Sequence, residues 1–141
     1  MKPSTGKDAD RVWQLLVSLV METRGDWRRQ VSAETGLPFS RARALWRLEH
    51  EARTLSELAC EMGTDAPAAT VIINDLERRG LVERRPHPDN RRAKLVSLTA
   101  AGRKLLAIVN RISDQPPAPI AALPAAQLAS LRRVLEADAK R

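Results

Sequence analysis

Apolar residues recur at helical spacing along most of the chain, and they change to short strand-like runs only between residues 81 and 98. Near the start, apolar positions three or four residues apart predict an amphipathic helix, with Val12, Leu15, Leu16 and Leu19 on its apolar face. Trp27 and Val31 continue an apolar face beyond Gly25. Gly25 either kinks one long helix or separates two, and the pattern allows both.

The pattern of residues 54–80 is typical of two short helices joined by a tight turn. Thr54 and Glu57 form a T-x-x-E capping box at the start of the first helix, and Gly63 supplies the positive φ that ends it. Asp65 can cap the second helix. The residues of that helix expected to face the core are Ala69, Ile72, Ile73 and Leu76.

Two runs of strand composition follow Gly80, LVERRP and RAKLVSL, separated by a turn rich in Pro, Asp and Asn. Two strands alone are marginal in water, so this hairpin must pack on the helices. Thr99 then caps a helix, with Leu105, Ile108, Val109 and Ile112 as its apolar stripe. A last helix begins near Pro124 and carries Leu128, Leu131 and Leu135.

This order predicts a mainly α fold with a small β-hairpin wing, a winged helix-turn-helix. The run LERRGLVERRPHPDNRRAKLVSLTAAG, with LSELA before it, resembles the MarR family of bacterial transcriptional regulators over roughly residues 54–102. The resemblance implies a single domain over residues 1–141. Its parts would be a winged helix-turn-helix at 40–102 and dimerisation helices at 8–36 and 103–141, with a recognition helix at 66–79 and a wing at 81–98.

One position departs from the family. Where the family's wing carries Asp-Arg-Arg, this chain has Asn90, Arg91 and Arg92, with Asp89 one position early. An Asn cannot form the family's carboxylate–Arg pair, so we expect the wing to be held differently, with Asp89 as the candidate.

Charge is distributed unevenly along the chain. The net charge is +7 and the pI is about 10.7, which favours a polyanionic partner, either a nucleic acid or an anionic membrane surface. Residues 54–77 contain five acids and no Lys or Arg, whereas residues 78–94 carry seven cations against two acids. A charge run is often only a solvated surface, but on a projecting hairpin it is well suited to phosphate contact.

The exposed face of the proposed recognition helix has no cation before Arg78. Direct readout would therefore use Asn74 on adenine, Thr70, and apolar contact of Ala68 or Val71 with thymine methyls. Phosphates would be held by the wing and Arg41, and Arg91 and Arg92 would enter a narrow A·T-rich minor groove. The expected DNA contacts are Ala66, Ala68, Thr70, Val71, Asn74, Arg84, Arg91, Arg92, Lys94 and Arg41. The competing interpretation is that Asn74 only solvates the helix and that the wing reads DNA shape.

The sequence gives little support for catalysis, cofactor binding, metal binding or disulfide formation. There is no Gly-rich phosphate loop, HExxH or nucleophile motif, so we expect no enzyme activity and no cofactor. His50 and His87 are 37 positions apart, which is not metal-ligand spacing. The single cysteine, Cys60, excludes an internal disulfide, and we expect it to be structural.

The resulting hypothesis is a sequence-specific regulator of double-stranded DNA, a repressor relieved by a small effector, acting as a homodimer on a palindromic operator. The alternative is a winged helix that binds another protein, against which the basic wing argues. The resemblance also implies a pocket for small aromatic effectors, with Trp13 and Trp46 as candidates for its lining. The N-terminus has no apolar signal region, and the apolar run Val12–Met21 is too short to span a membrane. We therefore expect a cytoplasmic protein.

Overall fold

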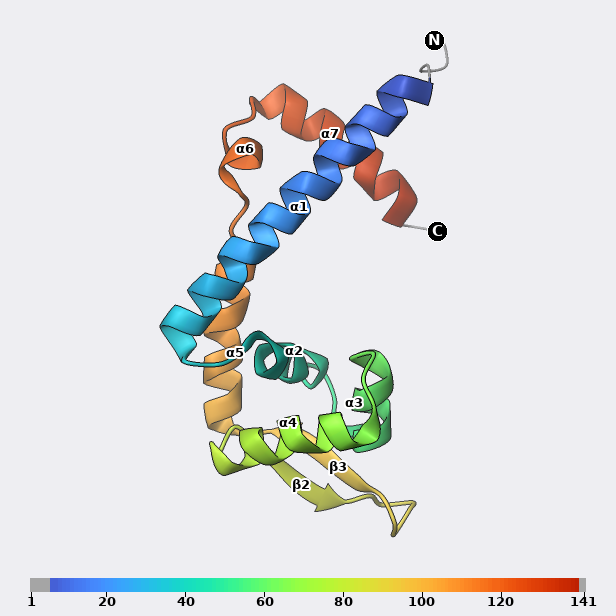
Figure 1. The fold of residues 1–141 in the computed structure, drawn as a ribbon, viewed down its shortest axis with the longest axis vertical. Coiled ribbons are helices and arrows are strands. Elements are labelled where there is room, and N and C mark those ends of the chain that lie inside the picture. Colours follow the sequence, from blue (N-terminus) through green and yellow to red (C-terminus); the bar gives the residue numbers. More distant parts are fainter. Residues whose placement is uncertain (1–5, 140–141) are drawn as a thin grey trace.

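The structure is a computed structural model that describes residues 6–139. Seven helices and three short strands follow one another in this part of the chain (Figure 1). In order they are α1 (Gly6–Thr35), α2 (Phe39–Arg47), β1 (Arg53–Thr54), α3 (Leu55–Glu61), α4 (Ala66–Arg78), β2 (Val82–Pro86), β3 (Lys94–Leu98), α5 (Ala100–Ser113), α6 (Ala118–Ala121) and α7 (Ala125–Ala139). The predicted fold class, mainly α with a winged helix-turn-helix, is confirmed.

The sheet is antiparallel with strand order β1-β3-β2. The hairpin register pairs Val82 with Leu98 and Arg84 with Val96. The strand β1 was not predicted, because two residues are too few to show alternation. It adds a third strand to β3 by pairing Arg53 with Val96.

The long first helix is continuous through Gly25. Its C-terminal half joins the core through Trp27 and Val31, whereas α2, α3, α4, the sheet and α5 supply the remaining buried residues. In α5 the buried positions are Leu106, Val109 and Ile112, and the predicted Leu105 and Ile108 are only half-buried. The apolar stripe of α5 is therefore rotated slightly from the predicted one.

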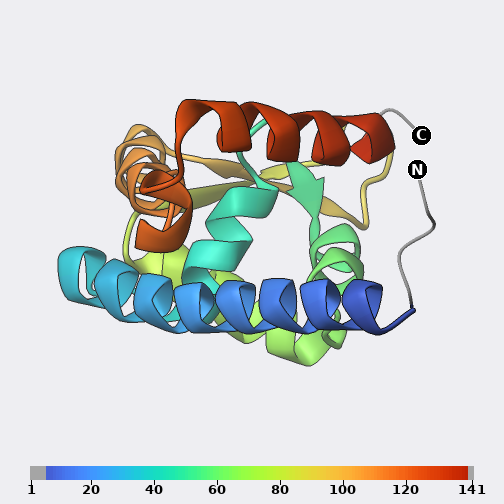
Figure 2. The same ribbon diagram turned by 90° about the horizontal axis from the view of Figure 1, so that it is seen from above.

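The N-terminal part of α1 and the helix α7 extend away from the winged-helix lobe (Figure 1). Viewed from above, they lie on opposite sides of the molecule (Figure 2). Both present large apolar side chains to solvent: Val12, Trp13, Leu15, Val20 and Met21 on α1, and Val134 and Leu135 on α7. Within residues 6–139, no helix is both long enough and apolar enough to cross a membrane.

Candidate nucleic-acid interface

The helix-turn-helix is set up by local caps. The reciprocal capping box of Thr54 and Glu57 starts α3, as predicted. Gly63 has a φ of 64° in the turn that follows. The Asp65 carboxylate accepts a hydrogen bond from the Ala68 N–H at 2.7 Å and so caps α4. These contacts hold the start of α4 at a defined angle to α3.

One face of α4 is open to solvent along its length. Ala66, Val71 and Asn74 are exposed, and 60% of Val71 is accessible. Ala68 and Thr70 are half-buried. The Thr70 hydroxyl donates to the Ala66 carbonyl at 2.9 Å, which leaves its lone pairs as acceptors. The predicted direct-readout residues therefore lie together along one side of the helix, with Ala68 and Thr70 at its edge.

The wing tip is held by Asn90 and not by Asp89. The Asn90 side chain accepts from the Arg92 N–H at 3.1 Å, and its backbone carbonyl accepts from the Ala93 N–H at 3.1 Å. Asp89 contributes its N–H to the His87 ring at 3.0 Å. The expectation that Asp89 replaces the family's carboxylate is therefore wrong, because an Asn side chain can brace a turn through backbone N–H groups alone.

The wing's cations do not all face the same way. Arg91, Arg92 and Lys94 are exposed, and within the described residues none of them forms an ion pair. Arg84 instead turns toward α4, where its Nη2 donates to the Asn74 side-chain oxygen and its Nε lies 3.8 Å from a Glu77 carboxylate oxygen. Its side chain is only 21% accessible.

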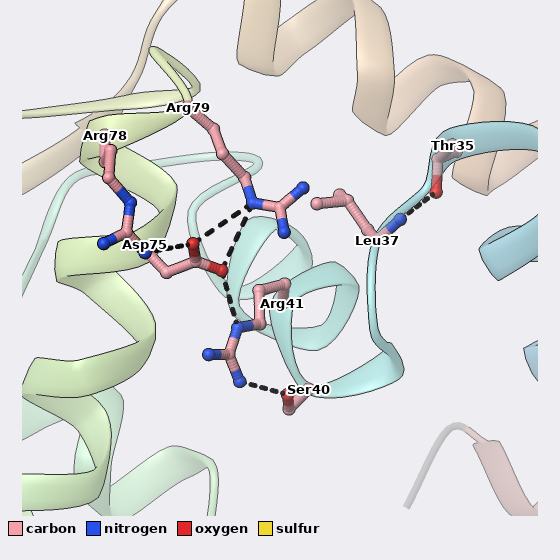
Figure 3. Close-up of polar contacts among 7 residues, drawn as sticks. All are labelled: Thr35, Leu37, Ser40, Arg41, Asp75, Arg78 and Arg79. Carbon is pink, nitrogen blue, oxygen red and sulfur yellow. Dashed lines mark hydrogen bonds and ion pairs between the residues drawn. The ribbon is translucent and has the colours of Figure 1, made fainter.

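Asp75 joins α4 to α2 through a cluster of arginines (Figure 3). Its carboxylate lies 3.0 Å from Arg41 Nε, 2.7 Å from an Arg78 amino group and 3.2 Å from Arg79 Nε. The hydrogen bonds from Arg78 and Arg41 hold the pKa of Asp75 well below its usual range. Arg41, expected to contact phosphate, is thus engaged within the protein, with 22% of its side chain accessible.

Sequence reasoning gave Asp75 no role, although a signal was present. An acid placed between the buried Ile72 and Leu76 of a helix needs a partner. Arginines three and four positions later, Arg78 and Arg79, are within reach on the same helix.

A cavity of about 760 Å³ lies between α1, α2 and the segment that leads into α6. Aromatic rings crowd its wall: Trp27 stacks on Trp46 with ring centroids 5.1 Å apart and meets Phe39 edge-on at 4.9 Å. The guanidinium of Arg28 lies 4.1 Å from the Phe39 ring centroid. Trp46 also donates from its ring N–H to Asn110 on α5.

The structure separates the two tryptophans that were expected to line one pocket. Trp46 borders this cavity, whereas Trp13 is 67% accessible and borders a shallow hollow on the N-terminal part of α1. The third tryptophan, Trp27, also borders this cavity, from the C-terminal half of α1. In the described part of the chain, no group of three or more His, Cys, Asp or Glu residues is arranged to hold a metal ion.

Comparison with known proteins agrees with this geometry. Residues 40–94 match the MarR family model. The transcriptional repressor MprA of Escherichia coli K12 is 41% identical over 51 residues, which are 36% of this chain and 29% of that protein. The chain thus spans less than a third of the length of the curated relative that it matches.

Solved structures share the fold over most of the chain. MepR, a transcription regulator of the Staphylococcus aureus multidrug efflux pump MepA, has a TM-score of 0.75 at 17% identity, over 89% of this chain and 94% of that one. A mutant Escherichia coli MarR complexed with operator DNA has a TM-score of 0.64 at 20% identity, over 95% and 97%. The family match falls on α2 to the start of β3, the segment that carries the helix-turn-helix and the wing. Residues 40–94 therefore match the MarR family, and the chain shares its fold with MarR-type structures over most of its length.

Proposed function

We propose that this protein is a sequence-specific double-stranded DNA-binding transcriptional regulator that acts as a homodimer. The observation that carries the proposal is the arrangement of α4, whose open face of short side chains lies beside a wing with three exposed cations. A helix of this kind fits the major groove, and a projecting basic hairpin fits the adjacent backbone and minor groove. The operator-bound MarR structure of the same fold supports this choice of partner.

Within this proposal the expected contacts divide by role. Ala66, Ala68, Thr70, Val71 and Asn74 would face base edges, whereas Arg91, Arg92 and Lys94 would meet the backbone and minor groove. Arg84 and Arg41 would act through the protein, since both are already engaged by side chains of α4.

The dimer is proposed from the apolar surface left open on α1 and α7. Val12 is 57% accessible, Trp13 67% and Leu135 57%, and contiguous exposed apolar surface marks association sites in soluble proteins. A two-fold dimer would place two copies of α4 on successive turns of one duplex face, which predicts a palindromic operator.

A small aromatic effector is proposed for the cavity that contains Trp27 and Trp46. Stacked rings offer a surface for a planar molecule. The ring N–H of Trp27 is buried without a partner among the described residues, and an acceptor on the ligand would satisfy it. Because α2 borders the cavity and also holds Asp75 of α4 through Arg41, an occupant would bias the placement of the recognition helix. We propose that such an effector relieves repression.

The test is a gel-shift titration of the full chain on duplexes selected from a random library, repeated at several salt concentrations. A DNA regulator should show one enriched, near-palindromic site and an affinity that falls linearly with salt on a log–log plot. No duplex binding at low salt would favour the alternative, a winged helix that contacts another protein.

A further inference from the structure

Arg78 extends the open face of α4 to the C-terminal end of the helix. Four positions share this face, because they are spaced four, three and four residues apart: Pro67, Val71, Asn74 and Arg78. All four are exposed, and 76% of the Arg78 side chain is accessible. The cation that residues 66–77 lack is therefore present on the same ridge, in line with Val71 and Asn74.

The guanidinium of Arg78 is tethered to a fixed carboxylate. Its Nη2 donates to Asp75 Oδ1 at 2.7 Å, and the Asp75 side chain is only 11% accessible. Long side chains on a helix point back toward its N-terminus, and Figure 3 shows Arg78 lying along α4 toward Asp75. The guanidinium therefore lies over the turn of α4 that carries Asn74 and Asp75, and not beyond the end of the helix.

Most of the hydrogen-bonding capacity of Arg78 is still free. A guanidinium has five N–H donors and no acceptor, and Asp75 uses one of them. The other four have no protein partner among residues 6–139. Because Arg41, Arg78 and Arg79 surround a single carboxylate, the cluster also keeps an excess of two positive charges. Arg78 is thus suited to a partner that offers acceptors.

Guanine offers the best match in the major groove. It presents two neighbouring acceptors, N7 and O6, whereas adenine and cytosine present an amino donor, and thymine presents one acceptor beside a methyl group. Only on guanine can a guanidinium bond two acceptors of one base at once. Because Asp75 already restricts the Arg78 side chain, less conformational entropy is lost when that side chain meets a base.

We propose that Arg78, oriented by Asp75, is a specificity-determining residue of α4 that selects a guanine in the major groove beside the base pair met by Asn74. This inference rests on the proposed function and deepens it, because it names a base that the same helix reads. It adds Arg78 to the expected DNA contacts.

A phosphate contact is the competing role for an exposed arginine. Phosphate contacts hold a protein on the duplex but carry no sequence information directly. The place of Arg78 on the ridge, in line with Val71 and Asn74, favours the base edges. Arg79 bonds the same carboxylate but lies five positions after Asn74, off this ridge, so it serves as a comparison within the same cluster.

The experiment measures base preferences and salt dependence together. Duplexes are selected with wild-type protein, and every half-site position of the selected site is then replaced by each base. These duplexes are titrated at several salt concentrations with four proteins: wild type, Arg78→Met, Asp75→Asn and Arg79→Met. Methionine keeps an unbranched apolar stem and removes the donors. Asp75→Asn keeps the shape of the side chain and removes its charge, and Arg79→Met is the matched control.

Wild type should prefer guanine at one position per half-site by about tenfold, the usual discrimination of one good base contact. Arg78→Met should lose this preference and keep the others, whereas Arg79→Met should keep them all. Asp75→Asn should reduce the guanine preference at that position alone, since a merely structural role would weaken binding to all four bases in the same ratio. The salt slope of Arg78→Met should equal that of wild type, because the substitution removes no cation that meets a phosphate.

The inference is overturned if Arg78→Met keeps every base preference of wild type while its salt slope becomes shallower by about one, since Arg78 then binds phosphate. It is also overturned if no guanine preference depends on Arg78, or if Asp75→Asn retains the full preference. Absence of duplex binding by wild type would overturn the proposed function as well, and so differs from binding with an unaltered preference.

Discussion

The Nε of Arg41 on α2 lies 3.0 Å from the Oδ2 of Asp75 on α4. This contact spans 34 positions in the sequence and connects α4 to α2, the helix that borders the aromatic cavity. With Arg78 and Arg79 on the same carboxylate, Asp75 holds three guanidinium groups while only 8% of it is accessible (Figure 3). The position of α4 therefore depends on an ionised Asp75.

The pH dependence of stability should reveal this dependence. An unfolded Asp titrates near pH 3.9, and the pKa of Asp75 in the folded protein is lowered, by Arg78 most and then by Arg41. The unfolded state then binds more protons, so the contribution of Asp75 to stability is present above about pH 4 and is lost as the pH falls below it. In urea titrations, the free energy of unfolding should decrease less between pH 7 and pH 3 for Asp75→Asn than for wild type.

Asp89→Asn makes the same chemical change on the exposed wing and serves as the control. In this variant the free energy of unfolding should decrease between pH 7 and pH 3 by about as much as in wild type. If the free energy of unfolding decreases equally in Asp75→Asn and in wild type, the arginine cluster does not contribute to the stability of the fold.

Gly102 should be intolerant of even one methyl group. A Cβ built at this position would lie 2.0 Å from the backbone carbonyl oxygen of Leu81 and 3.3 Å from a methyl carbon of Leu98. Because the first contact is with backbone, either α5 or the hairpin must shift, and overpacking of this kind usually costs about 1–3 kcal/mol. Gly102→Ala should lower the free energy of unfolding by at least that range in urea titrations.

Gly25→Ala is the matched control, because Gly25 is also helical but its added Cβ would meet only the end of the Arg29 side chain, at 3.7 Å. That substitution should stabilise the protein by about 0.5–1 kcal/mol through helix propensity. A Gly102→Ala variant as stable as Gly25→Ala would contradict the close approach of α5 to the hairpin.

Features decided by local chemistry could be predicted from the sequence. The caps at Thr54, Asp65 and Thr99 depend on bonds that span three residues, and all three are present. The hairpin was predicted for a similar reason, since its turn residues lie between two strand-like runs. Apolar spacing predicted the outward faces of α1 and α7 only in part, since Val12, Leu15 and Leu135 are exposed but Leu16, Leu19, Leu128 and Leu131 are half-buried.

Features that depend on two distant elements could not be predicted in the same way. The charge pattern groups Arg84 with the exposed cations of the wing, although alternation with Val82 places it on the inner face. No local pattern couples Arg41 to Asp75, and none separates Trp13 from Trp46. The direction of a charged side chain is set by what packs against it, and this is a property of the fold.

The dimer proposal predicts that charge on the exposed apolar stripes weakens association. Leu15→Glu and Leu135→Glu each place a carboxylate on a surface that the partner would desolvate, at a cost of several kcal/mol. Sedimentation should show a shift toward monomer at micromolar concentration. Val71→Glu alters an equally exposed apolar residue on α4 and should leave the sedimentation unchanged. A well-behaved monomer of the wild-type chain would contradict the proposal outright.

The wing tip provides the most direct measure of phosphate binding. Arg91→Ala and Arg92→Ala remove exposed cations, and the turn should persist because Asn90 holds it through the backbone N–H groups of residues 92 and 93. For each cation removed from a phosphate, the slope of log affinity against log salt should become shallower by about one. Binding should weaken for every duplex, with an additional weakening on A·T-rich flanks if the side chains enter the minor groove.

The control for these variants is the pair Arg132→Ala and Arg133→Ala, which removes the same charge from α7, away from the wing. If only the net charge of the protein affects DNA binding, the wing pair and the α7 pair of variants should weaken binding equally. Both should then leave the slope of log affinity against log salt nearly unchanged. If the tip touches phosphate, only the wing pair should change the slope, because counterion release depends on where a cation meets the backbone. Equal slopes for wild type and the wing pair would mean that the wing projects past the duplex, and specificity would then have to come from α4 alone.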